Sequence, residues 1–293
     1  MNNRPECIPC CLRRILLTAD RATTDEWLHR KILAESMREL ERLDDMPTPA
    51  EVIHAVWRRA TKTLGVADPY LEEKRRWIEE TTSNEDWIRE ELARQPDPLV
   101  AALQLAASAN ILDCEFRQDI VKSFSLKALV QHFAEVPFAV DNVEDLREAT
   151  QKAQRILFVH AAAGELLFDK FLIEALGKPR DAVISVVRAA PFLAHAVKED
   201  ADAVGLGDVA QIVTPGIDCA GLPLNACTEE FRETYRGADV VLAKGQACLE
   251  TLEGEEARLG DDQKEIYFLL RAKCSVVAHH LGVSVGDSIL EVN

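Results

Sequence analysis

The stretch that decides the fold runs from Arg155 to Leu176 and reads RILFVHAAAGELLFDKFLIEAL. It begins with four apolar residues, 156–159, a length typical of a buried strand. Three alanines and Gly164 follow, and apolar residues then recur at helical spacing with charged residues on the other side. Strand, small-residue turn and helix form the first half of a βαβ unit. In open α/β sheets such a turn lies at the carboxyl ends of the strands, where ligands bind.

The second half of the chain continues this pattern. Short apolar runs alternate with helix-like segments, and further strands are predicted at residues 182–187, 211–213, 240–243 and 265–270. This alternation is typical of a largely parallel sheet covered by helices on both faces. We therefore predict an α/β fold, with residues 141–293 forming the α/β part and a seam near Pro137.

The first half, residues 1–140, reads almost wholly helical, and no strong strand signal precedes Arg155. Asp25 is placed to cap a helix that runs to about Leu43. The sequence Thr48-Pro49-Ala50-Glu51 predicts a capping box with proline in the first helical turn. Further helices are predicted at residues 12–22, 70–94, 99–109, 116–132 and 143–153.

The composition is that of a globular protein, with 47% hydrophobic and 29% charged residues. The net charge of −16 argues against nucleic acid or an anionic membrane as the main partner, because both require a basic surface. A protein partner or a small anionic ligand remains open. No signal peptide or apolar stretch of about 18 residues is evident, so the simplest expectation is a cytoplasmic protein.

Three of the eight cysteines, Cys7, Cys10 and Cys11, lie close together near the start of the chain. The CxxC spacing is that of zinc ligands, but no second CxxC follows at the usual interval. The alternative is that these thiols pack where the N-terminal helix meets the α/β core, since free cysteine is commonly buried. The sequence favours packing.

Polar residues follow the predicted strands in four segments, which should converge at one edge of the sheet. The residues in these segments with side chains suited to catalysis or ligand binding are Glu165, His195, Cys219, Lys244 and Cys248. A lysine in such a loop is able to hold a phosphate as a point charge, although a solvated surface lysine has the same sequence pattern.

The order and spacing of several motifs resemble the metal-binding damage-control phosphatases, a former domain-of-unknown-function family with an acidic-residue methyltransferase-like branch. The motifs are ECIPCCLRR, LAASANILD, GELLFDKFLIE, VVRAAPFLAHAVKEDA, ADVVLAKGQACLETL and IYFLLRAKCSVVA. The resemblance covers nearly the whole chain and is to the short archaeal and bacterial members. It implies a helical N-terminal region on a three-layer α/β/α domain. It also implies hydrolysis of small phosphate esters with manganese, nickel, cobalt or magnesium.

Several family site residues are retained. Lys244 and Gly245 match the phosphate-side KGQ segment, and Glu165 ends the first catalytic turn as in the family. Asn110 and Asp113 match the family's asparagine and aspartate in the helical region. The resemblance therefore assigns catalysis to Lys244, Asn110 and Glu165, and substrate binding to Lys244, Gly245 and Asp113.

The metal-facing positions differ. The family's first aspartate–asparagine pair falls on Ala161 and Ala162, and its second asparagine–aspartate pair falls on Ala194 and His195. The asparagine of the KGQGN segment falls on Cys248. Hard divalent ions require oxygen ligands, so we do not expect such an ion to bind in the family manner.

Three hypotheses follow from these changes. In the first, the chain is a pseudoenzyme that serves as a binding or subunit-contact module. In the second, His195 and Cys248, with Cys219 or Cys227, hold a softer ion, because imidazole and thiolate suit zinc, iron, nickel or copper. The alternative, which the sequence favours, is that His195 and Cys248 only fill the space left by the lost site. In the third, Glu165 acts as a base beside an anion bound by Lys244, in a residual hydrolase.

Overall fold

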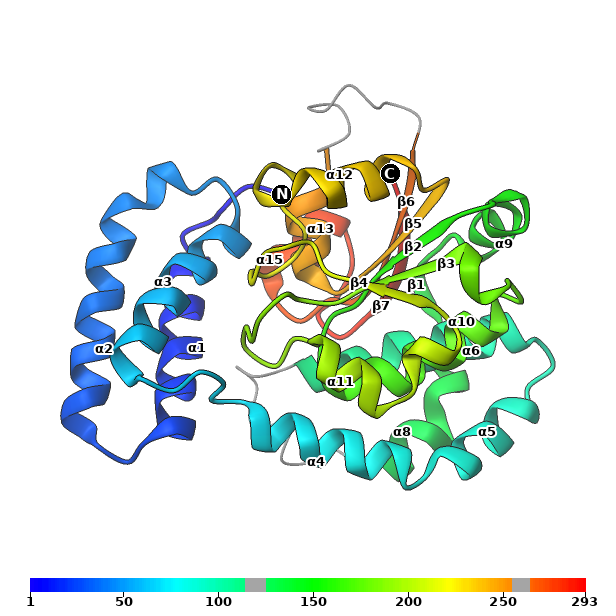
Figure 1. Cartoon of the computed structure of the whole chain (residues 1–293), viewed down its shortest axis with the longest axis horizontal. Coiled ribbons are helices and arrows are strands. Elements are labelled where there is room, and N and C mark those ends of the chain that lie inside the picture. The colour runs from blue at the N-terminus through cyan, green and yellow to red at the C-terminus, as the bar shows by residue number, and fades with distance from the viewer. Residues whose placement is uncertain (114–124, 255–263) are drawn as a thin grey trace.

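The computed structural model describes residues 1–113, 125–254 and 264–293. Its centre is a seven-stranded sheet with the order β1-β7-β6-β5-β2-β3-β4 (Figure 1). The strands are β1 Phe138–Asp141, β2 Ile156–Val159, β3 Val183–Val186, β4 Gln211–Val213, β5 Val240–Lys244, β6 Glu265–Arg271 and β7 Ser288–Val292. All neighbouring strands are parallel except β6 and β7, which pair antiparallel. The predicted α/β fold is confirmed.

Alternate residues of the central strands pack on opposite faces of the sheet. Ile156 and Phe158 belong to the core under α6 Pro98–Ala109 and α10 Leu166–Ala175, while Leu157 and Val159 belong to the opposite core. The helices of the second face are α12 Glu229–Arg236, α13 Gln246–Leu252 and α15 Ser275–Leu281. Two helix layers around one sheet form the three-layer arrangement visible in Figure 1.

The N-terminal helices form a bundle beside the sheet (Figure 1). They are α1 Cys7–Ala22, α2 Glu26–Glu39 and α3 Pro49–Leu64. Both predicted caps are present: Asp25 accepts from Trp27 and Leu28, and Thr48 and Glu51 form a capping box. The bundle core continues into the loop after β3 through Phe192 and Leu193.

A second group of helices lies below the sheet in the view of Figure 1: α4 Leu71–Thr82, α5 Glu85–Ala93, α6 and α8 Leu126–His132. Helix α9 Val143–Lys152 lies at the right-hand side of the sheet in this view. The predicted helix over 70–94 is two helices, because the backbone leaves the helical conformation at Asn84. The predicted helix over 116–132 is described only from Leu126, and its first part lies outside the described residues.

Two strands were missed by the sequence analysis. β1 lies inside the predicted seam, where its four residues alternate between half-buried and exposed, as expected for an edge strand. β7 ends the chain and pairs with both β1 and β6. The predicted boundary between the two parts, after residue 140, falls within β1. Leu103 of the first part and Leu146 of the second part belong to the same hydrophobic core. The two-part division remains a prediction.

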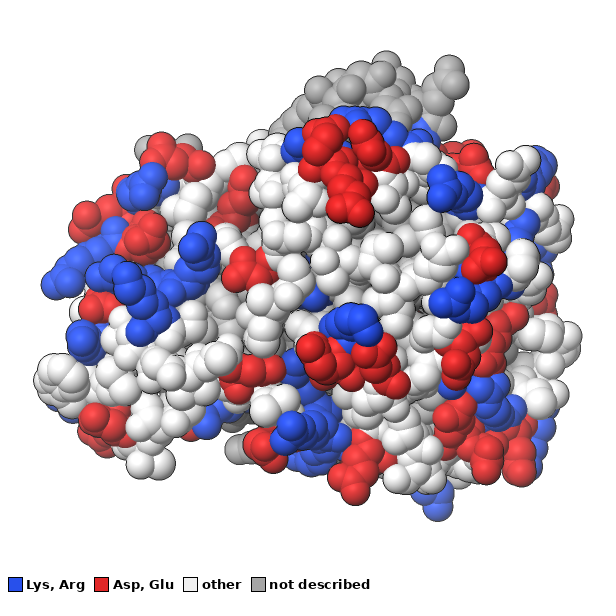
Figure 2. Space-filling model, viewed as in Figure 1, with Lys and Arg blue, Asp and Glu red and all other residues white. Residues whose placement is uncertain are grey.

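Surface charge is mixed in sign. Acidic and basic side chains are interspersed over the face shown in Figure 2. Among the described helices, none is both long and apolar enough to cross a membrane.

Candidate functional site

Three residues that the resemblance implicates lie together at the carboxyl end of the sheet. Lys244 ends β5, Glu165 lies in the 3-10 turn that follows β2, and Asn110 lies just beyond α6. The Lys244 Nζ lies 2.7 Å from Glu165 Oε2. The Asn110 Nδ2 donates to both oxygens of Glu165 at 3.0 and 3.1 Å. Its Oδ1 accepts from the Arg271 backbone nitrogen at 3.1 Å, which fixes the orientation of the amide.

His160 and Asp169 extend this group, and Asp169 was not identified from the sequence. The Lys244 ammonium also pairs with the Asp169 carboxylate. The second oxygen of Asp169 accepts from His160 Nδ1 at 2.8 Å, and His160 Nε2 lies 3.0 Å from Ser185 Oγ. We call Asn110, His160, Glu165, Asp169 and Lys244 the ionic cluster. Asp169 lies on α10 one turn after Glu165, and that i, i+4 spacing was the available sequence signal.

The ionic cluster is closed to solvent. The side chains of Lys244, Glu165, Asp169 and His160 are fully buried. Burial acts to raise the pKa of Asp169, but the Lys244 charge and the His160 hydrogen bond outweigh it and hold that pKa below its usual range. Burial likewise acts to lower the pKa of Lys244, and the two carboxylates outweigh it and raise that pKa. The cluster therefore holds one buried ammonium shared between two buried carboxylates.

Two other residues were predicted to bind substrate, Gly245 and Asp113. Gly245 has a φ of +86°, and a β-carbon there would lie 3.2 Å from Ala161 Cβ and 3.6 Å from Asn110 Nδ2. Gly245 thus brings the Lys244 loop against Ala161. The side chain of Asp113 lies outside the described residues.

The four positions that match the family's metal-facing pairs meet through their backbones. Ala162 and His195 form an isolated antiparallel bridge. The Ala163 nitrogen donates to the Ala194 oxygen at 2.9 Å, and the Ala196 nitrogen donates to the Ala161 oxygen at 2.9 Å. A tight turn precedes this pairing, closed by a hydrogen bond from the His195 nitrogen to Phe192. We call the segments 161–163 and 194–196 the paired loops.

His195 and Cys248, the predicted ligands of a converted site, have different surroundings. Cys248 belongs to the apolar core between α13 and the sheet, together with Cys227. His195 is buried and lines a pocket on the side of the N-terminal bundle, and Cys248 does not line that pocket. In the part of the chain that the structure describes, no three His, Cys, Asp or Glu side chains are arranged to hold a metal ion. Their joint role remains a prediction.

The pocket beside His195 collects the N-terminal cysteines. Cys7, Cys10 and Cys11 of α1 line it together with Cys274, which precedes α15. We call this space of about 140 Å³ the thiol pocket. These cysteines therefore lie where the first helix meets the α/β core, as the sequence analysis expected.

Arg188, just after β3, was quoted in a motif but given no role by the sequence analysis. It is 1% exposed, and its Nη2 lies 3.5 Å from the His160 oxygen. Its Nε and Nη1 have no hydrogen-bond partner among the described residues. A buried guanidinium with two such donors is costly unless an anion or water satisfies them.

The fold and the position of the ionic cluster define a three-layer α/β/α protein with its candidate site at the strand ends. The chain belongs to the family described as the damage-control phosphatase ARMT1-like domain, whose model matches residues 4–289. The resemblance drawn from the sequence motifs is confirmed.

Two archaeal relatives show how complete the similarity is. A damage-control phosphatase of Archaeoglobus fulgidus is 28% identical over 100% of this chain and 99% of its own length. One from Pyrococcus horikoshii is 28% identical over 96% of this chain and 94% of its own. A crystal structure of a DUF89 family protein from Pyrococcus horikoshii matches with a TM-score of 0.87 at 28% identity, covering 100% of this chain and 99% of that one.

Proposed function

We propose that this chain is a member of the damage-control phosphatase family that has lost the family's hard-metal site and acts as a binding or subunit module. The observation that carries the proposal is the chemistry of the paired loops. Their backbones pair at Ala161, Ala162 and His195, so two alanines and one imidazole stand where the resemblance places three oxygen ligands. Manganese or magnesium requires oxygen donors, so the residues present do not fit such an ion.

The retained residues do not replace the missing donors. Both carboxylates of the ionic cluster already contact Lys244, and Glu165 also accepts from Asn110. A phosphate brought to the Lys244 ammonium would lie against these two carboxylates and be repelled by them. The same contacts weaken the hypothesis of Glu165 as a base beside a bound anion, because the cluster has no exposed side chain to receive one.

Arg188 supports a role in binding. Its Nε and Nη1, which have no hydrogen-bond partner among the described residues, are able to donate charge-assisted hydrogen bonds to a small anion. A protein partner remains the alternative, and the acidic net charge of −16 favours a partner with a basic contact surface.

A phosphatase assay with a repaired site tests the proposal. The wild type, with manganese, nickel, cobalt or magnesium, is expected to hydrolyse sugar phosphates no faster than buffer. The repaired variant carries Ala161→Asp, Ala162→Asn, Ala194→Asn and His195→Asp, and is expected to bind manganese and gain hydrolysis. The single Ala162→Asn variant is its control and should remain inactive.

Either of two results with the wild type would overturn the proposal. Hydrolysis that requires an added divalent ion would mean that the hard-metal site persists. Hydrolysis that is unaffected by chelator would instead support the metal-independent hypothesis.

In the same samples, inorganic phosphate should raise the melting temperature of the wild type if Arg188 holds an anion, because a ligand stabilises the state that binds it.

A further inference from the structure

The thiol pocket gathers soft metal ligands from three separate parts of the chain. Cys7 and Cys10 come from the first turn of α1, Cys274 caps the start of α15, and His195 comes from the paired loops. Thiolate and imidazole are ligands that suit zinc and other thiophilic ions. This donor set differs from that of the ionic cluster, which consists of carboxylates, an amide, an imidazole and an ammonium.

The two cysteines of α1 share one face of the helix. Residues three apart lie on one face of a helix, so Cys7 and Cys10 point toward the same side of α1. Cys274 faces them from the α/β part. Its sulfur lies 3.5 Å from the Val277 nitrogen and 3.8 Å from Gln246 Nε2, contacts that hold the side chain at the pocket wall.

Burial and neighbouring negative charge raise the pKa values of the two α1 thiols. Burial, with smaller contributions from charge on Glu250, Cys10 and Cys274, raises the pKa of Cys7 to about 11. Burial also raises the pKa of Cys10, and charge on Cys274 adds to that effect while Arg14 opposes it. Without a metal, Cys7 and Cys10 are therefore protonated near neutral pH, and a cation that replaces their protons would remove the repulsion between thiolates.

We propose that Cys7, Cys10 and Cys274, with His195 as the fourth ligand, bind one thiophilic divalent ion of the zinc class. Three S–H groups lose their protons to solvent, three sulfur–metal bonds form, and neutral His195 donates a ring nitrogen. The resulting site has a net charge of −1, and Arg14 and Lys273 line the same pocket. Since no such trio in the described chain is already arranged to hold an ion, the side chains must rotate to close on it.

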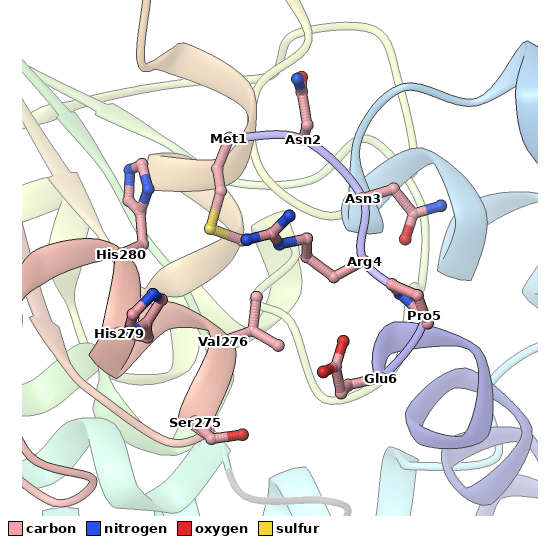
Figure 3. Close-up of a pocket in the computed structure, with 10 residues that line it drawn as sticks. All are labelled: Met1, Asn2, Asn3, Arg4, Pro5, Glu6, Ser275, Val276, His279 and His280. Atoms are coloured by element: carbon pink, nitrogen blue, oxygen red, sulfur yellow. The ribbon is translucent and has the colours of Figure 1, made fainter.

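A route from solvent adjoins the site. Figure 3 shows a groove with residues 1–6 on one side and Ser275, Val276, His279 and His280 of α15 on the other. Glu6, Ser275 and Val276 line both this groove and the thiol pocket, so the two spaces are neighbours. An ion bound there would join α1 of the bundle to α15 and the paired loops. The proposal does not depend on the loss of phosphatase activity.

Metal titration of the intact chain tests the site. The protein is purified without air, stripped with chelator and titrated with zinc or with cobalt as a spectroscopic probe. We expect one ion per chain, a thiolate-to-cobalt charge-transfer band and a higher melting temperature. Affinity should rise with pH, because binding releases protons from thiols whose pKa is raised.

Three substitutions test the ligands, and a fourth is their control. Loss of an outer hydrogen bond typically weakens metal binding by about 10–100-fold, so Cys10→Ser and Cys274→Ser should each weaken it by more than about 100-fold. His195→Ala should have an effect of the same order. Cys227→Ser is the matched control, since this buried thiol lies in another core, and it should bind zinc like the wild type.

The proposal is overturned if the stripped wild type takes up no zinc or cobalt, or if Cys10→Ser and Cys274→Ser bind as the wild type does. Unchanged binding by His195→Ala, together with loss in Cys11→Ser, would overturn the assignment of the fourth ligand. Circular dichroism of each variant shows whether a loss reflects unfolding. Because hydrolysis is not measured, these outcomes are separate from those of the phosphatase assay.

Discussion

The ionic cluster and the thiol pocket are both groups of titratable side chains near the paired loops, yet they are built in opposite ways. In the ionic cluster each carboxylate has a cationic or amide partner, and no side chain of the buried charged trio is exposed. The thiol pocket instead surrounds an open space of about 140 Å³, and Cys10 and Cys274 on its wall are partly exposed.

This difference separates two uses of the same family scaffold. A saturated, buried network specifies the arrangement of the elements around it, and removing one member leaves its partners uncompensated. A pocket lined by protonated thiols contributes little to folding by itself and is available to a ligand. The comparison therefore predicts large stability effects in the ionic cluster and small ones in the metal-free thiol pocket.

The largest effect is expected for Lys244→Met, which leaves the Glu165 and Asp169 carboxylates buried without their shared cation. Breaking a buried ion pair in this way costs about 3–5 kcal/mol. Urea unfolding of the variant measures the loss. Lys152→Met is the matched control, because its pair with Glu148 is exposed and worth less than about 1 kcal/mol. Equal losses in the two variants would contradict the structural role of the cluster.

A smaller effect, visible in its pH dependence, is expected for Asp169→Asn. The pKa of Asp169 is lowered in the folded protein, so its ionised form stabilises the fold above its unfolded pKa, near pH 4. That stability is lost as the pH falls through the lowered folded value. The free energy of unfolding should therefore fall less steeply with acid in the variant. Parallel curves for variant and wild type would show that this group does not contribute.

The smallest effect is expected for Cys10→Ser in the metal-free protein. Its side chain is partly exposed at the pocket wall, so the change should alter the free energy of unfolding by no more than about 0.5 kcal/mol. Thermal unfolding in the presence of chelator measures this. A loss comparable to that of Lys244→Met would place Cys10 in a structural network and remove the contrast between the two regions.

Much of the fold was predictable because its signals are local. The apolar run of β2 and the capping box at Thr48 are short patterns that packing did not override. β1 was missed because only alternate residues of this edge strand are half-buried, which leaves no continuous apolar run. The break at Asn84 was missed because the helices on either side are both rich in charged residues.

The site was predictable only in part. Motif resemblance identified Lys244, Glu165 and Asn110, which the structure brings together. Asp169 looked like an ordinary helix residue, because its contacts with Lys244 and His160 depend on three elements meeting in space. Cys274 lines the same pocket as Cys7 and Cys10 although it is more than 260 positions away in the sequence. No local sequence pattern predicts a contact over such a separation.

The paired loops are held together by contacts that do not depend on their side chains. Their contacts are made by peptide groups, at Ala162 with His195 and between Ala163 and Ala194, and peptide groups are the same whatever side chain is attached. A change of side chain at these positions therefore leaves the backbone contacts in place. The loops allow the chemistry of their side chains to vary while the fold that carries them is kept.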